Sequence, residues 1–294
     1  MNAVSPCVGV CKLDEATGYC LGCARTGEEI AVWRDQSDAW RSTVWDALPE
    51  RFETLGVTCR RLAWSTSDIR SFVKQSLERG AGTWVAGVVG AVGEFTAAPG
   101  QSTQVEVVDD TVTAMTEGGG LHFLIDDQVR ALIFEPTDTP IDKARIVLAV
   151  KRERGRPVVA DTLTHLGEDV NAVSPSNRAA SLFDLGLNRK EARFCVRVEA
   201  GEARAALFNA EGSAFPANLP QIGTALLKES PVRVIETALG RLEVSSAIPA
   251  PGGVSPLGPH THLLPDHLAS ERALPVGMDL PRAYLPGAIY CPAK

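Results

Sequence analysis

The sequence predicts an α+β protein in which a small cysteine-rich segment precedes a larger domain. In the larger part of the chain, predicted strands come first and helices later, without the regular alternation of a parallel α/β sheet. Four of the seven cysteines lie within the first 23 residues, in a segment too short to bury a core of its own. We therefore expect residues 1–52 to form a metal-stabilised module, residues 53–65 a linker and residues 66–294 an α+β domain with a proline-rich C-terminal strap.

The first expected element is a metal-binding loop. Cys7, Cys11, Cys20 and Cys23 follow the spacing C-x3-C-x8-C-x2-C. Thiolates are the preferred ligands of zinc and of iron–sulfur clusters, and four of them complete a tetrahedral site or a cluster cage. Turn-forming and charged residues between the two pairs allow the loop to fold back and bring the pairs together. The three-residue gap of the first pair departs from many zinc knuckles, and the spacing departs from ferredoxin patterns, so zinc and an iron–sulfur cluster both stay open.

Two helices are expected after the cysteines. Thr26 and Glu29 have the spacing of a capping box at the first helix start, and Ser37 signals the second. Apolar residues then repeat on one helical face, at Trp40, Val44 and Leu48. We expect the tryptophans of this region to form the core of the module rather than a lid or docking face: Trp33, Trp40 and Trp45.

Residues 4–52 resemble a short proteobacterial family of unknown function. The likeness rests on the runs SPCVGVCKLD at 5–14 and TGYCLGCART at 17–26, continues through Trp33 and ends near residue 51. Members of that family are generally labelled predicted iron–sulfur proteins. The resemblance therefore implies an iron–sulfur cluster at the four cysteines and favours it over zinc.

The larger domain is expected to begin with a helix that starts at Ser65 and ends at Gly80. Strands are predicted at residues 83–95, 104–108, 111–116, 121–125, 131–134, 146–150, 193–198 and 232–248, the last with a turn at 240–241. Further helices are predicted at residues 176–185, 202–209 and 219–228. Prolines concentrate in the final fifty residues, which we expect to pack across the domain as an extended strap with little regular structure.

A second metal site is a hypothesis based on the histidines of that strap. His260 and His262 point to the same face if the segment is extended, as in many H-x-H metal pairs. Glu94 is a carboxylate in an otherwise apolar strand and needs a partner, so it is the expected third ligand, with Asp266 or His267 as alternatives. The competing interpretation is that the histidines simply bond backbone carbonyls.

Residues 66–294 are similar to an uncharacterised alphaproteobacterial family. The likeness is carried by residues 82–95, by residues 182–187 and by the run SPLGPHTHLLP at 255–265. That family has no assigned reaction. The resemblance therefore implies a domain boundary and a bacterial origin, and no chemistry.

Composition narrows the class of protein. A chain of 294 residues with 45% hydrophobic and 22% charged residues is neither disordered nor a coiled coil. A net charge of −7 argues against a nucleic-acid partner. No apolar run approaches the ~20 residues of a membrane span. The N-terminus has no secretory signal, so we expect a cytoplasmic protein with reduced cysteines.

Three functions follow from these observations, and whether the protein is an enzyme stays open. The favoured one is an accessory or binding protein, with the four-cysteine module joined to a domain that binds a protein or small-molecule partner. The second is a metalloenzyme that uses His260, His262 and a carboxylate, with a structural zinc at the cysteines. The third is a haem or iron-handling protein with a histidine as axial ligand.

Overall fold

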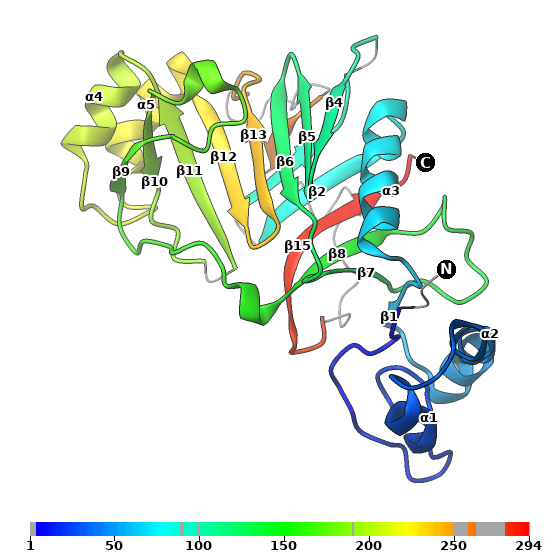
Figure 1. Ribbon diagram of the computed structural model, residues 1–294. Coiled ribbons are helices and arrows are strands. Elements are labelled where there is room, and N and C mark those ends of the chain that lie inside the picture. Colours follow the sequence, from blue (N-terminus) through cyan, green and yellow to red (C-terminus); the bar gives the residue numbers. More distant parts are fainter. Residues whose placement is uncertain are drawn as a thin grey trace.

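Two antiparallel sheets, packed face to face, form the larger domain (Figure 1). The computed structural model describes residues 4–88, 91–98, 100–189, 191–249, 258–262 and 280–293. The first sheet contains, in spatial order, β1 (Arg60–Arg61), β7 (Val129–Ile133), β8 (Ile146–Lys151), β15 (Tyr284–Cys291), β2 (Thr83–Val88), β3 (Ala91–Phe95) and β14 (His260–His262). The second contains β4 (Gln104–Val108), β5 (Thr111–Thr116), β6 (Gly119–Leu124), β13 (Gly240–Val244), β12 (Val232–Thr237), β11 (Ala192–Val198), β10 (Ser181–Asp184) and β9 (Thr164–Glu168).

The helices flank these sheets, and the predicted α+β class is confirmed. They are α1 (Gly27–Val32), α2 (Asp38–Leu55), α3 (Thr66–Arg79), α4 (Glu202–Asn209) and α5 (Leu219–Glu229), with 3-10 turns at Arg152–Arg154 and Pro175–Asn177. In Figure 1, α3 lies near β4 and β5, whereas α4 and α5 lie beside β9, β10 and β11 at the other end of the second sheet. Within the described residues, no helix combines the length and the apolar composition that crossing a membrane requires.

The predicted helix starts are confirmed by their caps. Thr26 and Glu29 form a capping box at α1, and the Ser37 hydroxyl accepts the Trp40 N–H at α2. Ser65 forms a second capping box at α3, which ends at Gly80 in the left-handed conformation. These local hydrogen bonds satisfy helix-end N–H groups that have no partner within the helix.

Large apolar side chains fill the space between the sheets. The buried cluster includes Trp84 and Phe95 from the first sheet, Phe123 and Ile235 from the second, and Ile69 from α3. A second cluster under α4 and α5 extends the core beyond the edge of the first sheet. It comprises Leu163, Phe183, Leu185, Val196, Val198, Ala203, Leu207, Ala210 and Ile222. The second sheet is therefore covered by the first sheet at one end and by helices at the other.

The helix predicted at residues 176–185 is wrong. The structure has a 3-10 turn at Pro175–Asn177 and then β10, in which all four residues are buried. β10 pairs with β9 on one side and β11 on the other, and β9 was not predicted at all. A strand between two neighbours buries side chains on both faces, so Leu182 and Phe183 enter separate apolar clusters. A helix would bury a single stripe.

The proline-rich tail also differs from its prediction. We expected little regular structure, but β15 is a long strand between β8 and β2, and its Cys291 is buried. Pro286 fits because the register with β8 shifts between Pro286 and Ala288, where a bulge removes the need for a ladder N–H. Residues 250–257 and 263–279 of the tail lie outside the described residues. The expected linker is likewise part of the fold, since β1 pairs with β7.

Gly186 is a position where the backbone requires glycine. Its φ is +71°, and a Cβ there would lie 2.3 Å from the carbonyl carbon of Thr162. Gly212 has a similar φ of +82° with nothing within 4 Å of an added Cβ. We expect Gly212→Ala to lower the free energy of unfolding by about 1 kcal/mol, from backbone strain alone, and Gly186→Ala to lower it by about 3 kcal/mol or more. Urea denaturation of both variants measures the difference, and equal losses would contradict the close packing at Gly186.

Candidate functional site

The cysteine-rich loop folds back on itself, as the spacing predicted. Isolated antiparallel bridges join Leu13 to Cys20 and Tyr19 to Thr26. The N–H of Leu21 donates to the Lys12 carbonyl at 2.8 Å, which closes the loop between the two cysteine pairs. The segment that carries the first pair therefore runs beside the turn that carries the second.

The second pair lies in a tight, buried turn. Cys20 and Cys23 are 1% and 2% exposed, and the Ala24 N–H donates to the Cys20 carbonyl at 2.8 Å. Gly22 packs closely against the segment between Cys7 and Cys11, because a Cβ on Gly22 would lie 2.7 Å from the Cβ of Val10. Glycine at this position lets the two cysteine-bearing segments touch.

The two thiols of the second pair have pKa values shifted in opposite directions. Burial, the largest influence on Cys20, acts to raise its pKa, but backbone hydrogen bonds from Gly22, Cys23 and Lys12 lower the pKa below its ordinary value. Burial raises the pKa of Cys23 to about 11, although its Sγ accepts the Arg25 Nε–H at 3.4 Å. The backbone N–H groups of the turn therefore favour the thiolate form of Cys20.

The thiols stand as two pairs. The Cys7 thiol acts on the pKa of Cys11, and the Cys23 thiol acts on the pKa of Cys20. The negative charge of Cys7 is the largest cause of the raised pKa of Cys11, and the charge of Cys20 contributes to it. Within the described ranges, no three histidine, cysteine, aspartate or glutamate side chains are grouped closely enough to hold a metal ion. The donor chemistry fits zinc or an iron–sulfur cluster, and binding requires the two pairs to close together.

Two arginines lie against these thiols without a carboxylate partner. Arg25 is 3% exposed, and its guanidinium carbon lies 4.5 Å from the ring centroid of Trp33. Arg61 donates from Nη1 to the Ser5 carbonyl, and its buried Nε has no hydrogen-bond partner among the described residues. Burial lowers the pKa of Arg61 to about 10, and the Cys7 charge acts in the opposite direction. In the described part of the chain, neither guanidinium lies within ion-pair distance of a carboxylate.

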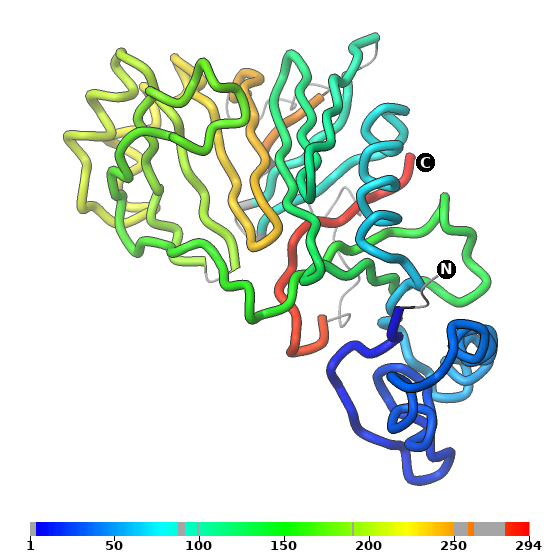
Figure 2. Tube along the Cα trace, viewed as in Figure 1, coloured from blue at the N-terminus to red at the C-terminus, as the bar shows by residue number. Residues whose placement is uncertain are grey.

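The loop is anchored to the first sheet. Val8 is 1% exposed and packs with Leu132, Phe134 and Tyr284. The Trp45 indole donates to the Val4 carbonyl at 2.8 Å, and this bond connects α2 to the segment that precedes Cys7. Figure 2 shows this N-terminal part of the chain, in blue, far from the end of the molecule that carries α4 and α5.

The tryptophans of the module lie in its core, as the sequence predicted. Trp33 is buried in a cluster with apolar side chains of α2, and the other two tryptophans pack against it. The cluster comprises Ala24, Trp33, Val44, Leu48 and Phe52. It directly adjoins the second cysteine pair, because Ala24 follows Cys23.

The structure brings together two of the three residues of the predicted second metal site. β14 pairs with β3 so that His260 stands opposite Glu94, with 3.6 Å between Nε2 and Oε2, and His262 stands opposite Val92. His260 Nδ1 also lies 2.7 Å from the Gly258 carbonyl, which is the contact of the competing interpretation. The His262 side chain, Asp266 and His267 lie outside the described residues.

Sequence reasoning missed a cleft of about 620 Å³ on the outer face of the second sheet. Its polar lining includes His122, Arg178, Arg193, Glu236 and Arg241. A signal for it exists in the sequence, because Arg241 and Glu243 alternate with apolar residues in β13 and Arg193 and Arg197 lie on one face of β11. Charged residues on one face of a strand predict a polar sheet face. A polar face that is also buried indicates a functional site or an ion network.

Comparisons with known proteins match the two parts of the chain separately. The model of a family of unknown function (DUF6925) matches residues 68–294. The model of a protein of unknown function (DUF1289) matches residues 5–52, the cysteine-rich segment. No curated protein and no solved structure matches the chain. The expected likeness to two uncharacterised families is confirmed, and neither match names a metal or a reaction.

Proposed function

The chain belongs to the family of unknown function DUF6925, and from this premise we propose that it is a metal-binding accessory protein. The proposed metal centre is a four-thiolate site made by Cys7, Cys11, Cys20 and Cys23, which holds zinc or an iron–sulfur cluster. The larger domain then serves to bind a protein or small-molecule partner.

The observation that supports this proposal best is the pair of arginines without carboxylates. Buried charges in proteins are paired, because an isolated ion in a poorly solvated site is strongly unfavourable. Four thiolates around a divalent zinc ion leave two negative charges, and Arg25 and Arg61 supply two positive ones beside them. The same balance holds for a cluster core of charge +2. A set of neutral thiols would leave Arg61 without a compensating carboxylate and Arg25 with only Glu29, which lies beyond ion-pair distance but whose pKa the Arg25 charge lowers.

The fold-back of the loop supports the same proposal. Apolar side chains of the loop such as Val10 and Leu13 are exposed, at 44% and 46%. The order of the loop therefore needs another source of free energy, which metal binding to the folded chain would supply. The Val8 side chain of the loop packs against the first sheet. A metal centre formed in the loop would therefore also fix the N-terminal module on the larger domain. When bound, zinc would act as a structural crosslink, and an iron–sulfur cluster would add one-electron redox chemistry.

Arg61→Gln tests the charge balance. We expect this variant to lose its metal at about tenfold lower chelator concentration than the native chain, equivalent to about 1.4 kcal/mol of binding free energy. Arg60→Gln is the matched control, because Arg60 is the neighbouring residue of β1 but donates to the Glu135 carbonyl and lies over the Phe52 ring. The measurement is a chelator titration of the purified full chain, followed by metal analysis. Equal chelator sensitivity of native, Arg60 and Arg61 variants would contradict the proposed role of Arg61.

A further inference from the structure

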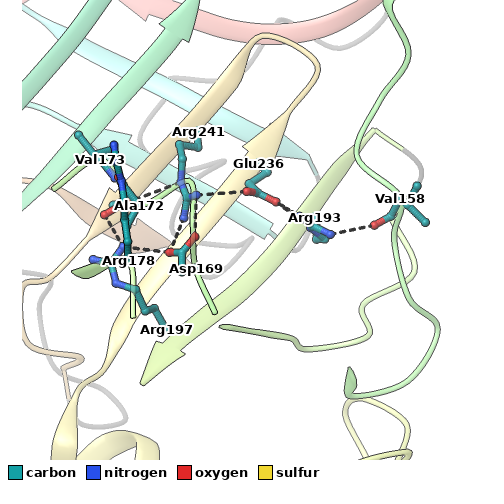
Figure 3. Close-up of polar contacts among 10 residues, drawn as sticks. Val158, Asp169, Ala172, Val173, Arg178, Arg193, Arg197, Glu236 and Arg241 are labelled. Carbon is teal, nitrogen blue, oxygen red and sulfur yellow. Dashed lines mark hydrogen bonds and ion pairs between the residues drawn. The ribbon is translucent and has the colours of Figure 1, made fainter. Parts of the chain in front are cut away.

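The outer face of the second sheet carries a buried network of charges (Figure 3). Asp169, in the loop that crosses this face, accepts from Arg241 at 2.9 and 2.8 Å and from Arg197 at 3.1 Å. Glu243 accepts from Arg197 at 2.7 Å and from the Val173 N–H at 2.9 Å. These contacts hold the loop of residues 169–178 on the sheet and leave every charge of the network paired.

The cleft lies beside this loop. Its floor is formed by side chains of β5, β6, β12 and β13, and its wall by the loop and by Pro157. On the far side, Arg193 bonds to Glu236 at 2.7 Å and to the Val158 carbonyl at 3.4 Å (Figure 3). The volume of about 620 Å³ lies within the range of cofactor and small-ligand sites.

One end of the cleft is electropositive. His122 projects from β6, with its Nδ1 3.2 Å from the Thr113 hydroxyl. Burial lowers the pKa of His122, and the charges of Arg241 and Arg178 lower it further, against the opposing charge of Glu243. The imidazole is therefore neutral at pH 7 and offers a hydrogen bond, while the unpaired positive charge at this end comes from Arg178.

Arg178 is the arginine of the cleft that the protein does not neutralise. It lies on the loop, is solvent-exposed, and donates from Nε to the Ala172 carbonyl at 3.4 Å. Among residues in the described ranges, no carboxylate lies within ion-pair distance of it. Its fork of remaining N–H donors thus faces the cleft without an anionic partner, next to a neutral histidine and a hydroxyl.

We propose that this cleft binds a small organic anion, with Arg178 pairing with its carboxylate or phosphate group and His122 and Thr113 hydrogen-bonding to a neighbouring polar atom. Glu106 stands opposite Thr113 in the sheet and Glu236 opposite Arg241, on the two sides of His122, and both line the cleft and suit hydroxyl or amine groups of the same ligand. The buried network preorganises this site, because it fixes the loop that carries Arg178 before the ligand arrives. The inference is independent of any metal at the cysteines.

Nuclear magnetic resonance of the histidine rings tests this proposal on the full chain. Labelled protein is titrated with inorganic phosphate and, separately, with succinate at constant ionic strength, and the His122 signals are assigned with His122→Asn. We expect a saturable shift of the His122 ring signals with at least one of these anions. A response to phosphate alone identifies a phosphate ester as the ligand class, a response to succinate alone a carboxylate, and a response to both the shared anion chemistry.

Variants at Arg178 decide between a site and a general salt effect. Arg178→Gln should raise the half-saturating anion concentration at least tenfold without lowering the melting temperature, because the side chain is exposed. Arg178→Lys should restore part of the response, and Arg79→Gln, an exposed arginine on α3, should leave it unchanged. The absence of a saturable His122 shift with either anion, or an unchanged half-saturation in Arg178→Gln, would overturn the proposal.

Discussion

Cys20→Ser is expected to abolish metal binding and to unfold the N-terminal module while the larger domain stays folded. Cys20 is the thiol that receives three backbone hydrogen bonds and whose pKa is lowered, and serine offers a much poorer ligand to zinc or iron. Structural metal sites contribute on the order of 10 kcal/mol to folding, far more than the small cluster around Trp33 can replace. The measurements are metal per chain and limited proteolysis, with new cleavage expected ahead of residue 52.

Two matched variants make this result specific. Cys59→Ser removes a thiol that packs on the first sheet outside the set of four, and the metal content should not change. His260→Ala should also retain the metal, because the accessory function places none at His260 and Glu94. Loss of a second metal equivalent in His260→Ala would instead favour the metalloenzyme. Full metal retention in Cys20→Ser would show that the four thiols do not share one site.

Asp169→Asn is expected to lower the free energy of unfolding by about 3–5 kcal/mol, as is typical when one partner of a buried ion network is removed. Asp169 is 2% exposed and accepts hydrogen bonds from two buried arginines, so its neutralisation leaves one buried positive charge in excess beside Glu243 and frees the loop over the cleft. Asp138→Asn, at an exposed position, is the control and should change the free energy by less than about 0.5 kcal/mol.

Urea denaturation measures this effect at the midpoint of the transition, with an unchanged slope if unfolding stays two-state. Anion binding in the cleft should weaken in the same variant, because the loop carrying Arg178 loses its anchor. A loss below about 1 kcal/mol would mean that solvent already screens the network.

Local signals in the sequence were sufficient to predict many of the secondary-structure elements. The capping residues Thr26, Ser37 and Ser65 each act within four residues of the helix they start, so no tertiary information was needed. β10 and β15 depend on distant partners instead. The run containing Leu182 and Phe183 has no alternation, and β15 contains Pro286, which local rules exclude from a central strand. Gly287 fits there because a Cβ would lie 2.6 Å from the Leu148 carbonyl, a contact invisible in sequence.

In the candidate sites too, the features set by local sequence could be predicted and those set by distant strand pairing could not. The spacing of the cysteines predicted the fold-back of the loop, because turns are local, but not that Arg61 would lie beside it, since β1 reaches that place by pairing with β7. The contact of His260 with Glu94 was predicted from the need of a buried carboxylate for a partner. The cleft at His122 could not be predicted, because its residues come from strands and a loop whose order in the sheet is set by long-range pairing.

In the proposed function, the four N-terminal cysteines hold one metal centre. The most direct test is the iron, acid-labile sulfide and zinc content of full-length protein purified without oxygen, together with its visible spectrum. We expect one centre per chain, seen either as iron with matching sulfide and a brown chromophore or as one zinc without colour. Protein that folds with all four thiols free and no more than traces of either metal would contradict it.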